Sequence, residues 1–184
     1  MDYSTMRLFL SEENIKMHLE YLNKQRLVYS ILQKSNPQIV GDNIKDIFNK
    51  NLSQKDKFDA INLLCDIKSH EIFFNSFASS VPVCKRIKKY YSSAEKLIYD
   101  VYVLAKNNST GFVYLCMDKK GNPRIEYRRE SSDIFIKYEP VLALDLCEHA
   151  YFKDYGFNKD RYLKNDLGYF DLKLLDDRLI SLDN

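Results

Sequence analysis

The chain contains three histidines, His18, His70 and His149, and each falls on a different predicted element. A neutral imidazole can ligate a metal ion or act as a general base, so these side chains have the widest chemical capacity in the sequence. A single histidine on a partly apolar helix is, however, more often a hydrogen-bonded core or surface residue than a ligand. Spacing alone therefore assigns no site, and the neighbouring residues must distinguish a shared centre from three unrelated positions.

The most specific motif of the chain surrounds the third histidine. Ala143–Phe152 reads ALDLCEHAYF and resembles the carboxy-terminal ligand motif D-x-W-E-H-A-Y of the iron/manganese superoxide dismutases. Two other stretches agree with the same family: Leu10–His18 resembles its first-helix ligand segment, and His70–Phe74 resembles its second, H-x-x-x-W. Weaker similarities extend the resemblance over nearly the whole chain, through Ser109–Leu115 and Tyr162–Arg178.

The resemblance implies a mononuclear metal centre. The family's four ligand positions are occupied by His18, His70, Asp145 and His149, so we expect one manganese or iron ion per chain. Neutral imidazoles and a carboxylate suit a borderline ion and lack the thiolates that select zinc or copper(I). The family's reaction, superoxide dismutation, oxidises one superoxide to dioxygen and reduces the next to hydrogen peroxide with two protons. We therefore expect an oxidoreductase with superoxide as its substrate.

Glu148, next to a predicted ligand, also matches a family feature. In the family, a glutamate at this position reaches across a two-fold interface to the ring N–H of the equivalent ligand histidine, here His149. Such a bond would fix the tautomer of that imidazole. The resemblance therefore implies a homodimer, and the alternative is an ordinary surface glutamate on a helix.

The residues that surround the metal in the family are largely replaced here. Arg26 stands at the gateway tyrosine position, where its cation either attracts the superoxide anion or plugs the entrance. Asp66 stands at one of two positions that supply the active-site glutamine. Its carboxylate either accepts a hydrogen bond from metal-bound water or adds a fifth protein ligand, and the alternative is a solvated helix residue. Loss of the family's amide, phenol and imidazole groups predicts slower proton delivery. The other replacements are Leu22 for a histidine, Ser132 for the second glutamine position, Phe74, Phe112, Tyr114 and Cys147 for tryptophans, and Phe152 for a tyrosine.

Two other functions fit part of the sequence. A catalytically degenerate protein of this fold can have a structural or binding role, for example in a ribonucleoprotein assembly, and Lys85–Tyr91 (KRIKKYY) offers cations and tyrosines to nucleic acid. Two observations make nucleic-acid binding less favourable: the net charge is only +2, and short charged runs are usually solvated loops or helix ends. The four ligands would also hold a redox-inert zinc ion. Nucleophilic hydrolysis is disfavoured, because three histidines in one cluster leave no general base.

The predicted elements run from helices to a sheet and back to helices, which indicates an α+β fold. Ser11 caps a helix predicted over residues 12–33, and Ser53 begins a second helix that runs past His70 to Phe77. These two helices predict an amino-terminal helical hairpin domain over residues 1–83.

A mixed carboxy-terminal domain is predicted over residues 84–184, with the metal site between the two domains. A capping box at Ser92 and Glu95 begins its first helix. Three short β-rich runs then predict an antiparallel sheet, and helices follow from Glu148 onward; the runs are residues 112–117, 124–127 and 141–144.

Composition describes a globular chain, because 45% of the residues are hydrophobic and 14% aromatic. No apolar run approaches the ~20 residues that span a bilayer, and no secretory leader is visible, so we expect a cytoplasmic protein with no membrane partner. The cysteines show no CxxC spacing and are expected to be reduced: Cys65, Cys84, Cys116 and Cys147. Cys147 is expected to pack in the core, with a thiolate ligand as the alternative.

Overall fold

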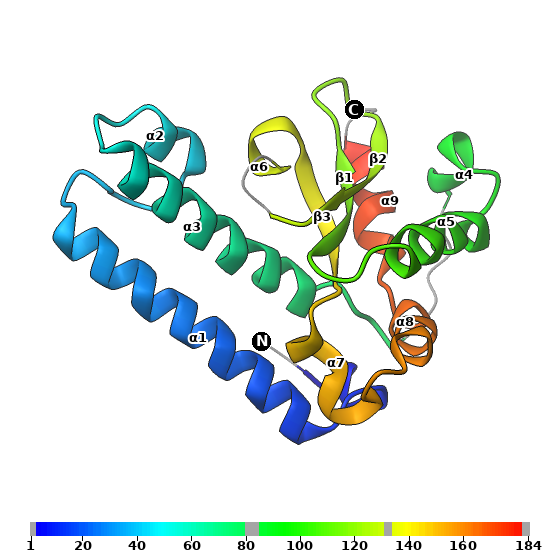
Figure 1. The fold of residues 1–184 in the computed structure, drawn as a ribbon. Coiled ribbons are helices and arrows are strands. Elements are labelled where there is room, and N and C mark those ends of the chain that lie inside the picture. The colour runs from blue at the N-terminus through cyan, green and yellow to red at the C-terminus, as the bar shows by residue number, and fades with distance from the viewer. Residues whose placement is uncertain (1–2, 80–84, 131–133, 182–184) are drawn as a thin grey trace.

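Two long helices form an antiparallel hairpin in the first part of the chain (Figure 1). α1 (Glu12–Ser35) begins after Ser11, whose side chain accepts a hydrogen bond from a main-chain N–H of the first turn, and α3 (Gln54–Phe74) begins after Ser53 in the same way. Both caps confirm the starts predicted from the sequence. The computed structural model describes residues 3–79, 85–130 and 134–181.

The second helix of the hairpin ends earlier than predicted, at Phe74 rather than Phe77. Beyond it, the Ser76 hydroxyl donates to the carbonyl oxygen of Ile72 at 2.8 Å, which satisfies one of the free carbonyl groups at the helix end. Phe77 instead forms an isolated antiparallel bridge with Phe170. The end of the hairpin is thereby joined to the last part of the chain.

Three antiparallel strands form the sheet, in the order β2-β1-β3. β1 (Phe112–Met117) has the predicted bounds, whereas β2 (Pro123–Arg128) and β3 (Glu139–Asp145) are longer than predicted. Proline cannot donate to a strand ladder, and both strands that contain one, at Pro123 and Pro140, are edge strands. The predicted α+β fold is confirmed.

Helices surround this sheet, and several were not predicted because they are too short to show a helical period. The helix predicted to begin at Ser92 is α5 (Ala94–Lys106), and its cap is instead Ser93, whose side chain accepts a hydrogen bond from the main-chain N–H of Lys96. The helices besides α1 and α3 are η1 (Met6–Leu8), α2 (Ile44–Phe48), α4 (Ile87–Tyr90), α5 (Ala94–Lys106), α6 (Ile134–Lys137), α7 (Glu148–Tyr155), α8 (Lys159–Leu167) and α9 (Leu172–Ser181).

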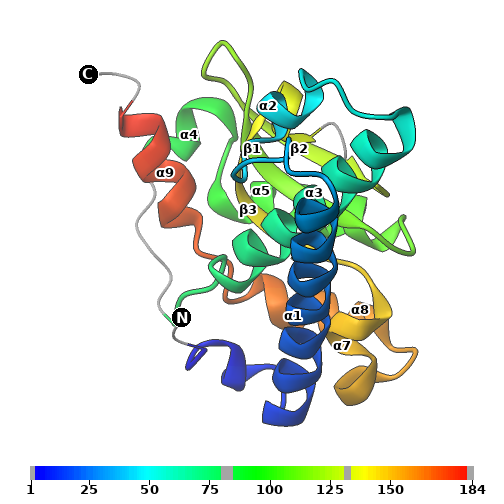
Figure 2. The same cartoon turned by 90° about the vertical axis from the view of Figure 1, so that its left-hand side faces the viewer.

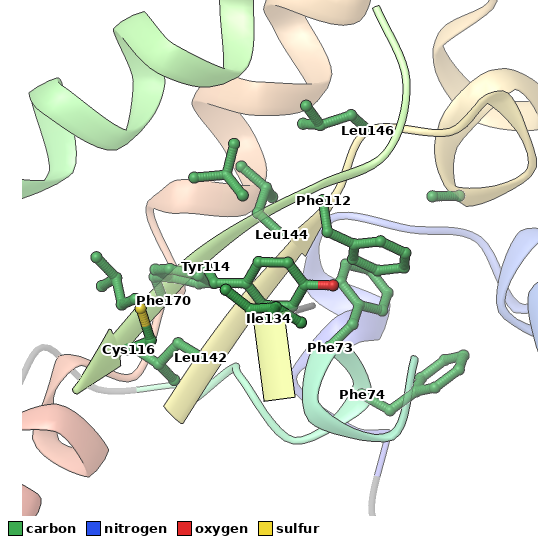
Figure 3. Close-up of a cluster of buried hydrophobic side chains, with 14 of the residues drawn as sticks. Phe73, Phe74, Phe112, Tyr114, Cys116, Ile134, Leu142, Leu144, Leu146 and Phe170 are labelled. Carbon is green, nitrogen blue, oxygen red and sulfur yellow. The ribbon is translucent and has the colours of Figure 1, made fainter. Parts of the chain in front are cut away.

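The core lies on both faces of the sheet, and all six residues of β1 are buried. α3 and α9 pack against β3, while α5 packs against β1 and β2, as Figures 1 and 2 show. A buried polar contact joins α3 to the sheet, because the hydroxyls of Ser69 and Tyr114 lie 2.6 Å apart. Figure 3 shows Tyr114 and Phe112 of β1 beside Phe73 at the end of α3. These contacts fix the hairpin relative to the end of β3.

The predicted division into residues 1–83 and 84–184 falls within residues 80–84, outside the described part of the chain, and it stays a prediction. Cys84 lies there as well. The other cysteines are free thiols, as predicted. Within the described residues, no helix is both long enough and apolar enough to cross a bilayer.

Candidate metal centre

Four elements each contribute one polar side chain to a common point. His18 comes from α1, His70 from the last turns of α3, Asp145 from the end of β3 and His149 from the first turn of α7. The potential ligand atoms of these four residues lie within 4.8 Å of one another. The structure therefore brings together all four residues that the family resemblance indicated.

The histidine rings are arranged around a single carboxylate oxygen. Asp145 Oδ2 lies 3.2 Å from His18 Nε2, 3.4 Å from His70 Nε2 and 3.0 Å from His149 Nε2. The Nε2 atoms of His70 and His149 are 3.1 Å apart. His18, His70 and Asp145 are fully buried, whereas the side chain of His149 is 24% exposed. Solvent therefore reaches the cluster at His149.

Contacts on either side of Asp145 orient its carboxylate. Its Oδ1 accepts the main-chain N–H of Cys147 at 2.8 Å, within the turn that leads into α7. Its main-chain oxygen accepts the hydroxyl of Tyr162, which is fully buried, at 2.8 Å. With Oδ1 and the carbonyl engaged in this way, Oδ2 is the oxygen directed at the histidines.

His70 has a hydrogen bond that orients its ring and selects its tautomer. Its Nδ1 donates to the main-chain oxygen of Asp66 at 2.7 Å, one helical turn earlier on α3. The proton at Nδ1 leaves the Nε2 lone pair directed into the cluster. A ligand imidazole that donates its other ring N–H to a carbonyl is the usual arrangement at protein metal sites.

Burial and neighbouring charges shift the pKa values of the cluster in opposite directions. Burial lowers the pKa of His18 to about 4, against the opposing pull of Asp145. Burial alone would raise the pKa of Asp145, but the charge and the hydrogen bond of His149, together with the nearby rings of His18 and His70, hold that pKa well below its usual range. Burial would lower the pKa of His149, and Asp145 outweighs this and raises it. At neutral pH the cluster therefore contains an ionised carboxylate and a neutral His18.

A metal ion fits these four residues. His18 Nε2 approaches Asp145 without hydrogen-bond geometry, so neither ring nitrogen of this buried histidine has a hydrogen-bond partner among the described residues. Buried polar atoms without a partner are rare, and a metal ion would engage one of these nitrogens. Ligand atoms about 2.1 Å from a shared ion lie about 3.0–3.6 Å apart, and the four distances given above fall in that range. Three imidazoles and a carboxylate suit manganese or iron and also permit zinc.

Aromatic rings enclose the buried side of the cluster. The centroid of the His18 ring lies 5.0 Å from that of Phe73 and 4.8 Å from that of Phe74, and the His70 centroid lies 5.1 Å from that of Phe112. Phe74 and Phe112 occupy two positions at which the family has tryptophan. These rings keep water from His18 and His70, which lowers the local dielectric and strengthens the electrostatic interactions of the cluster.

Tyr21 also contacts the cluster, and the sequence prediction missed it. Its ring stacks on His149 with centroids 4.2 Å apart and planes 16° apart, and its centroid is 5.1 Å from that of His70. Burial raises the pKa of the phenol, with a further rise from the charge of Asp66. Tyr21 follows His18 by three residues, so the helical period puts both on one face of α1. That spacing is the signal that could have identified it.

The two polar substitutions singled out from the sequence lie beside the cluster. Asp66 is outside the four-residue ligand group: its Oδ1 is 3.5 Å from His70 Nδ1, the ring nitrogen that faces away from Asp145. Burial raises the pKa of this carboxyl group. Arg26 is partly exposed and forms an ion pair with Glu71 at 2.8 Å, which joins α1 to α3. Their predicted roles at the metal and at the entrance stay predictions.

Glu148 and Cys147 precede His149 at the start of α7. Glu148 is exposed, as an intersubunit role requires. The Cys147 sulfur lies 3.3 Å from Thr110 Oγ1 and accepts the N–H of Gly111 at 3.4 Å, and burial raises its pKa to about 12. The thiol therefore faces the start of β1 and stays protonated, which favours packing over ligation.

The remaining replaced positions are hydrophobic with one exception. Leu22 is buried on α1, Tyr114 is buried in β1, and Phe152 is 42% exposed on α7. Ser132, aligned with the second glutamine position, lies outside the described residues.

The basic run Lys85–Tyr91 contains α4, a single turn of helix. Asp176 of α9 accepts the main-chain N–H groups of Lys85, Arg86 and Ile87 at 2.7–3.0 Å. This carboxylate fixes the start of the run against α9, so these main-chain contacts stabilise the fold. Nucleic-acid binding by its cations stays a prediction.

Comparison with known proteins relates the chain to one family. The family profile described as "Iron/manganese superoxide dismutases, C-terminal domain" matches residues 79–178, more than half of the chain. A stretch of 61 residues is 34% identical to "Superoxide dismutase [Mn], mitochondrial" of Schizosaccharomyces pombe. That stretch represents 33% of this chain and spans only 28% of the relative.

Proposed function

Because this chain belongs to the iron/manganese superoxide dismutase family, we propose that it binds one manganese or iron ion and converts superoxide to dioxygen and hydrogen peroxide. The ligands in this proposal are His18, His70, Asp145 and His149. The observation that carries it is the arrangement of three Nε2 atoms within 3.0–3.4 Å of one buried carboxylate oxygen. His18, His70 and Asp145 are fully buried ionisable groups that need a partner, and an ion shared with His149 supplies one for all three.

When bound, the metal supplies one-electron chemistry, so that two superoxide ions and two protons yield dioxygen and hydrogen peroxide. The protein holds the four ligand atoms in place. Asp145 contributes a negative charge that its low pKa keeps ionised, and the carbonyl of Asp66 holds the Nδ1 proton of His70. The aromatic rings of Phe73, Phe74 and Phe112 exclude water from the buried side, so substrate approaches on the side of His149.

Arg26 is proposed to act at the entrance and not on the metal. Arg26 is on α1, the helix of His18, and its guanidinium is paired with Glu71 on α3, the helix of His70. This pairing offsets part of its charge. Both side chains are more than a third exposed, at 43% and 37%, so the pair is screened by solvent and can open. An open Arg26 would raise the local concentration of an anionic substrate.

A homodimer is the proposed assembly. Glu148 is exposed at the first position of α7, and the neighbouring His149 is the ligand that remains partly exposed in the single chain. If two copies pair about a two-fold axis, Glu148 of each can accept the free ring N–H of His149 in the other. Sedimentation of the metal-loaded protein tests this pairing, and a monomer with full metal occupancy would exclude the role of Glu148.

The proposed activity is tested by superoxide consumption together with metal analysis of the same purified samples. The wild type should contain manganese or iron and consume superoxide, and His149→Ala should lose most of both. Asp100→Ala is a matched control, because this carboxylate lies on α5 and pairs only with the exposed Lys96 in the described structure. It should match the wild type.

Three results would contradict the proposal. A protein that selects zinc over manganese and iron would have a structural metal site, and one that takes up no metal would be a scaffold. A protein that holds manganese or iron but does not consume superoxide would be a degenerate member of the family.

A further inference from the structure

Tyr21 has contacts with three parts of the candidate metal site, although no ligand position of the family falls on it. Its ring lies flat on the His149 imidazole, with centroids 4.2 Å apart and an interplanar angle of 16°. Its hydroxyl donates to Asp66 Oδ2 at 3.4 Å, which links α1 to α3. The main-chain oxygen of Asp66 holds His70 at 2.7 Å. One aromatic side chain therefore spans α1, α3 and α7.

His149 differs from His70 in how its ring is held. His70 is held through Nδ1, the nitrogen that faces away from the cluster, whereas the hydrogen bonds found for His149 within the described residues are both on Nε2. Nε2 is also the atom that would bind an ion, and metal ligation would replace its contacts with Asp145 and His70. The stack with Tyr21 contacts the ring face and would persist.

The ring of Tyr21 separates His149 from a groove beside the cluster. A cavity of about 550 Å³ lies between α1 and α3, and both Tyr21 and Asp66 line it. Apolar side chains of Val28, Ile31 and Leu32 continue the wall along α1. Tyr21 thus has the groove at one side and the imidazole of His149 at the other. Removing its ring would open the face of His149 to water.

From these contacts we infer that Tyr21, tethered by Asp66, is a positioning residue that fixes the ring plane of His149 so that Nε2 faces the ion. This inference rests on the proposed function, because it assigns His149 as a ligand. The stacked ring carries the effect, and the hydroxyl tether adds to it. Residues that orient a metal ligand from outside the ligand set typically change metal affinity by about 10- to 100-fold when they are replaced.

The test measures Mn²⁺ affinity by chelator competition and the electron paramagnetic resonance spectrum of bound Mn²⁺. Tyr21→Leu removes the stacked ring and should raise the dissociation constant by about 10- to 100-fold. Tyr21→Phe keeps the ring and loses the tether, so it should stay within about 5-fold of the wild type and restore the wild-type spectrum. The spectrum reports ligand geometry, which a purely structural loss of packing would leave unchanged.

Tyr29→Leu is the matched control, because Tyr29 is a buried tyrosine two turns further along α1 with its hydroxyl on the carbonyl oxygen of Gly41 at 3.2 Å. It should lower the melting temperature without a change in Mn²⁺ affinity or spectrum. If Tyr21→Leu destabilises the metal-free chain more than Tyr29→Leu does, Tyr21→Met is compared with the wild type in place of Tyr21→Leu. Methionine has no aromatic face but fills more of the volume of the tyrosine ring.

Equal Mn²⁺ affinity and equal spectra for the wild type and Tyr21→Leu would overturn the positioning role. In that case a wild type that binds Mn²⁺ and consumes superoxide would leave the proposed function intact. A wild type that binds neither Mn²⁺ nor iron would overturn both. Looser binding and an altered spectrum in Tyr21→Leu, restored in Tyr21→Phe, would establish the role.

Discussion

Asp166 offers a quantitative prediction about stability, because it is a buried carboxyl group outside the metal site. Its side chain is fully buried on α8, and neither side-chain oxygen has a hydrogen-bond partner among the described residues. The nearby hydroxyl of Tyr162 donates to the carbonyl of Asp145 instead. Burial therefore raises the pKa of Asp166 well above its ordinary value of 3.8.

The raised pKa of Asp166 determines how this group changes the stability of the fold with pH. The folded state binds the proton more tightly than the unfolded chain, so the contribution of Asp166 favours folding below about pH 3.8 and is lost as the pH rises. Between the unfolded and folded pKa values, each pH unit lowers the free energy of unfolding by about 1.4 kcal/mol. At neutral pH the group therefore destabilises the protein.

Asp166→Leu removes the carboxyl group and fills its site with an apolar side chain. We expect this substitution to stabilise the metal-free chain at pH 7 by about 1–4 kcal/mol, or about 2–4 °C in melting temperature for each kcal/mol. Asp166→Asn removes the charge but keeps an unsatisfied polar group, so its gain should be smaller.

Urea unfolding at several values between about pH 4.5 and about pH 7.5 measures the difference between wild type and variant. Taking this difference cancels the titration of groups common to both proteins. The advantage of Asp166→Leu should be small at the acid end and should grow with pH. An advantage independent of pH, or a variant less stable throughout, would refute the reasoning.

Three further predictions follow from the site and the sheet. Asp145 raises the pKa of His149, so Mn²⁺ must displace a proton from that ring when it binds. The apparent Mn²⁺ affinity, measured by titration at several pH values, should therefore fall as the pH decreases. His149→Gln should reduce this pH dependence by about one proton. A variant with an unchanged slope would exclude this proton. Arg26→Tyr should change superoxide turnover more than metal content, measured by the assay and elemental analysis, and equal effects on both would rule out an entrance role. Gly111 has φ +91°, and a Cβ there would lie 2.3 Å from the carbonyl oxygen of Arg128. Gly111→Ala should therefore destabilise the chain by about 3 kcal/mol or more in urea unfolding. A variant as stable as the wild type would contradict that geometry.

The parts of the fold that the sequence predicted are those with strong local signals. Ser11 and Ser53 each combine a capping side chain with a long helix behind it, and both helices begin where expected. The cap of α5 was misplaced by one residue because Ser92 and Ser93 both have the required hydroxyl. Backbone geometry, which the sequence does not show, selects Ser93.

Features that depend on distant partners were not predictable in the same way. The start of α4 depends on Asp176, which lies about 90 residues further along the chain and accepts its first N–H groups. The early end of α3 depends on the pairing of Phe77 with Phe170. Neither contact has a local pattern.

For the candidate site, resemblance to three separate segments of the family identified the four converging residues, which spacing alone could not do. The contacts around them could not be obtained in this way. The family resemblance places Arg26 at the gateway position, whereas in the structure its side chain pairs with Glu71. Tyr21, which is not among the family positions aligned with this chain, is the aromatic residue that stacks on His149. Replacement of one surrounding residue changes how its neighbours pack, and only the folded arrangement shows the result.

The central claim is that His18, His70, Asp145 and His149 share one ion, and elemental analysis after reconstitution with manganese or iron tests it most directly. Asp145→Ala removes the oxygen that all three imidazoles face, and Asp100→Ala removes a partly buried carboxylate on α5, away from the cluster. We predict about one ion per chain in the wild type and in Asp100→Ala, and almost none in Asp145→Ala. Equal metal content in Asp145→Ala and the wild type, or no metal in any of the three proteins, would contradict the claim.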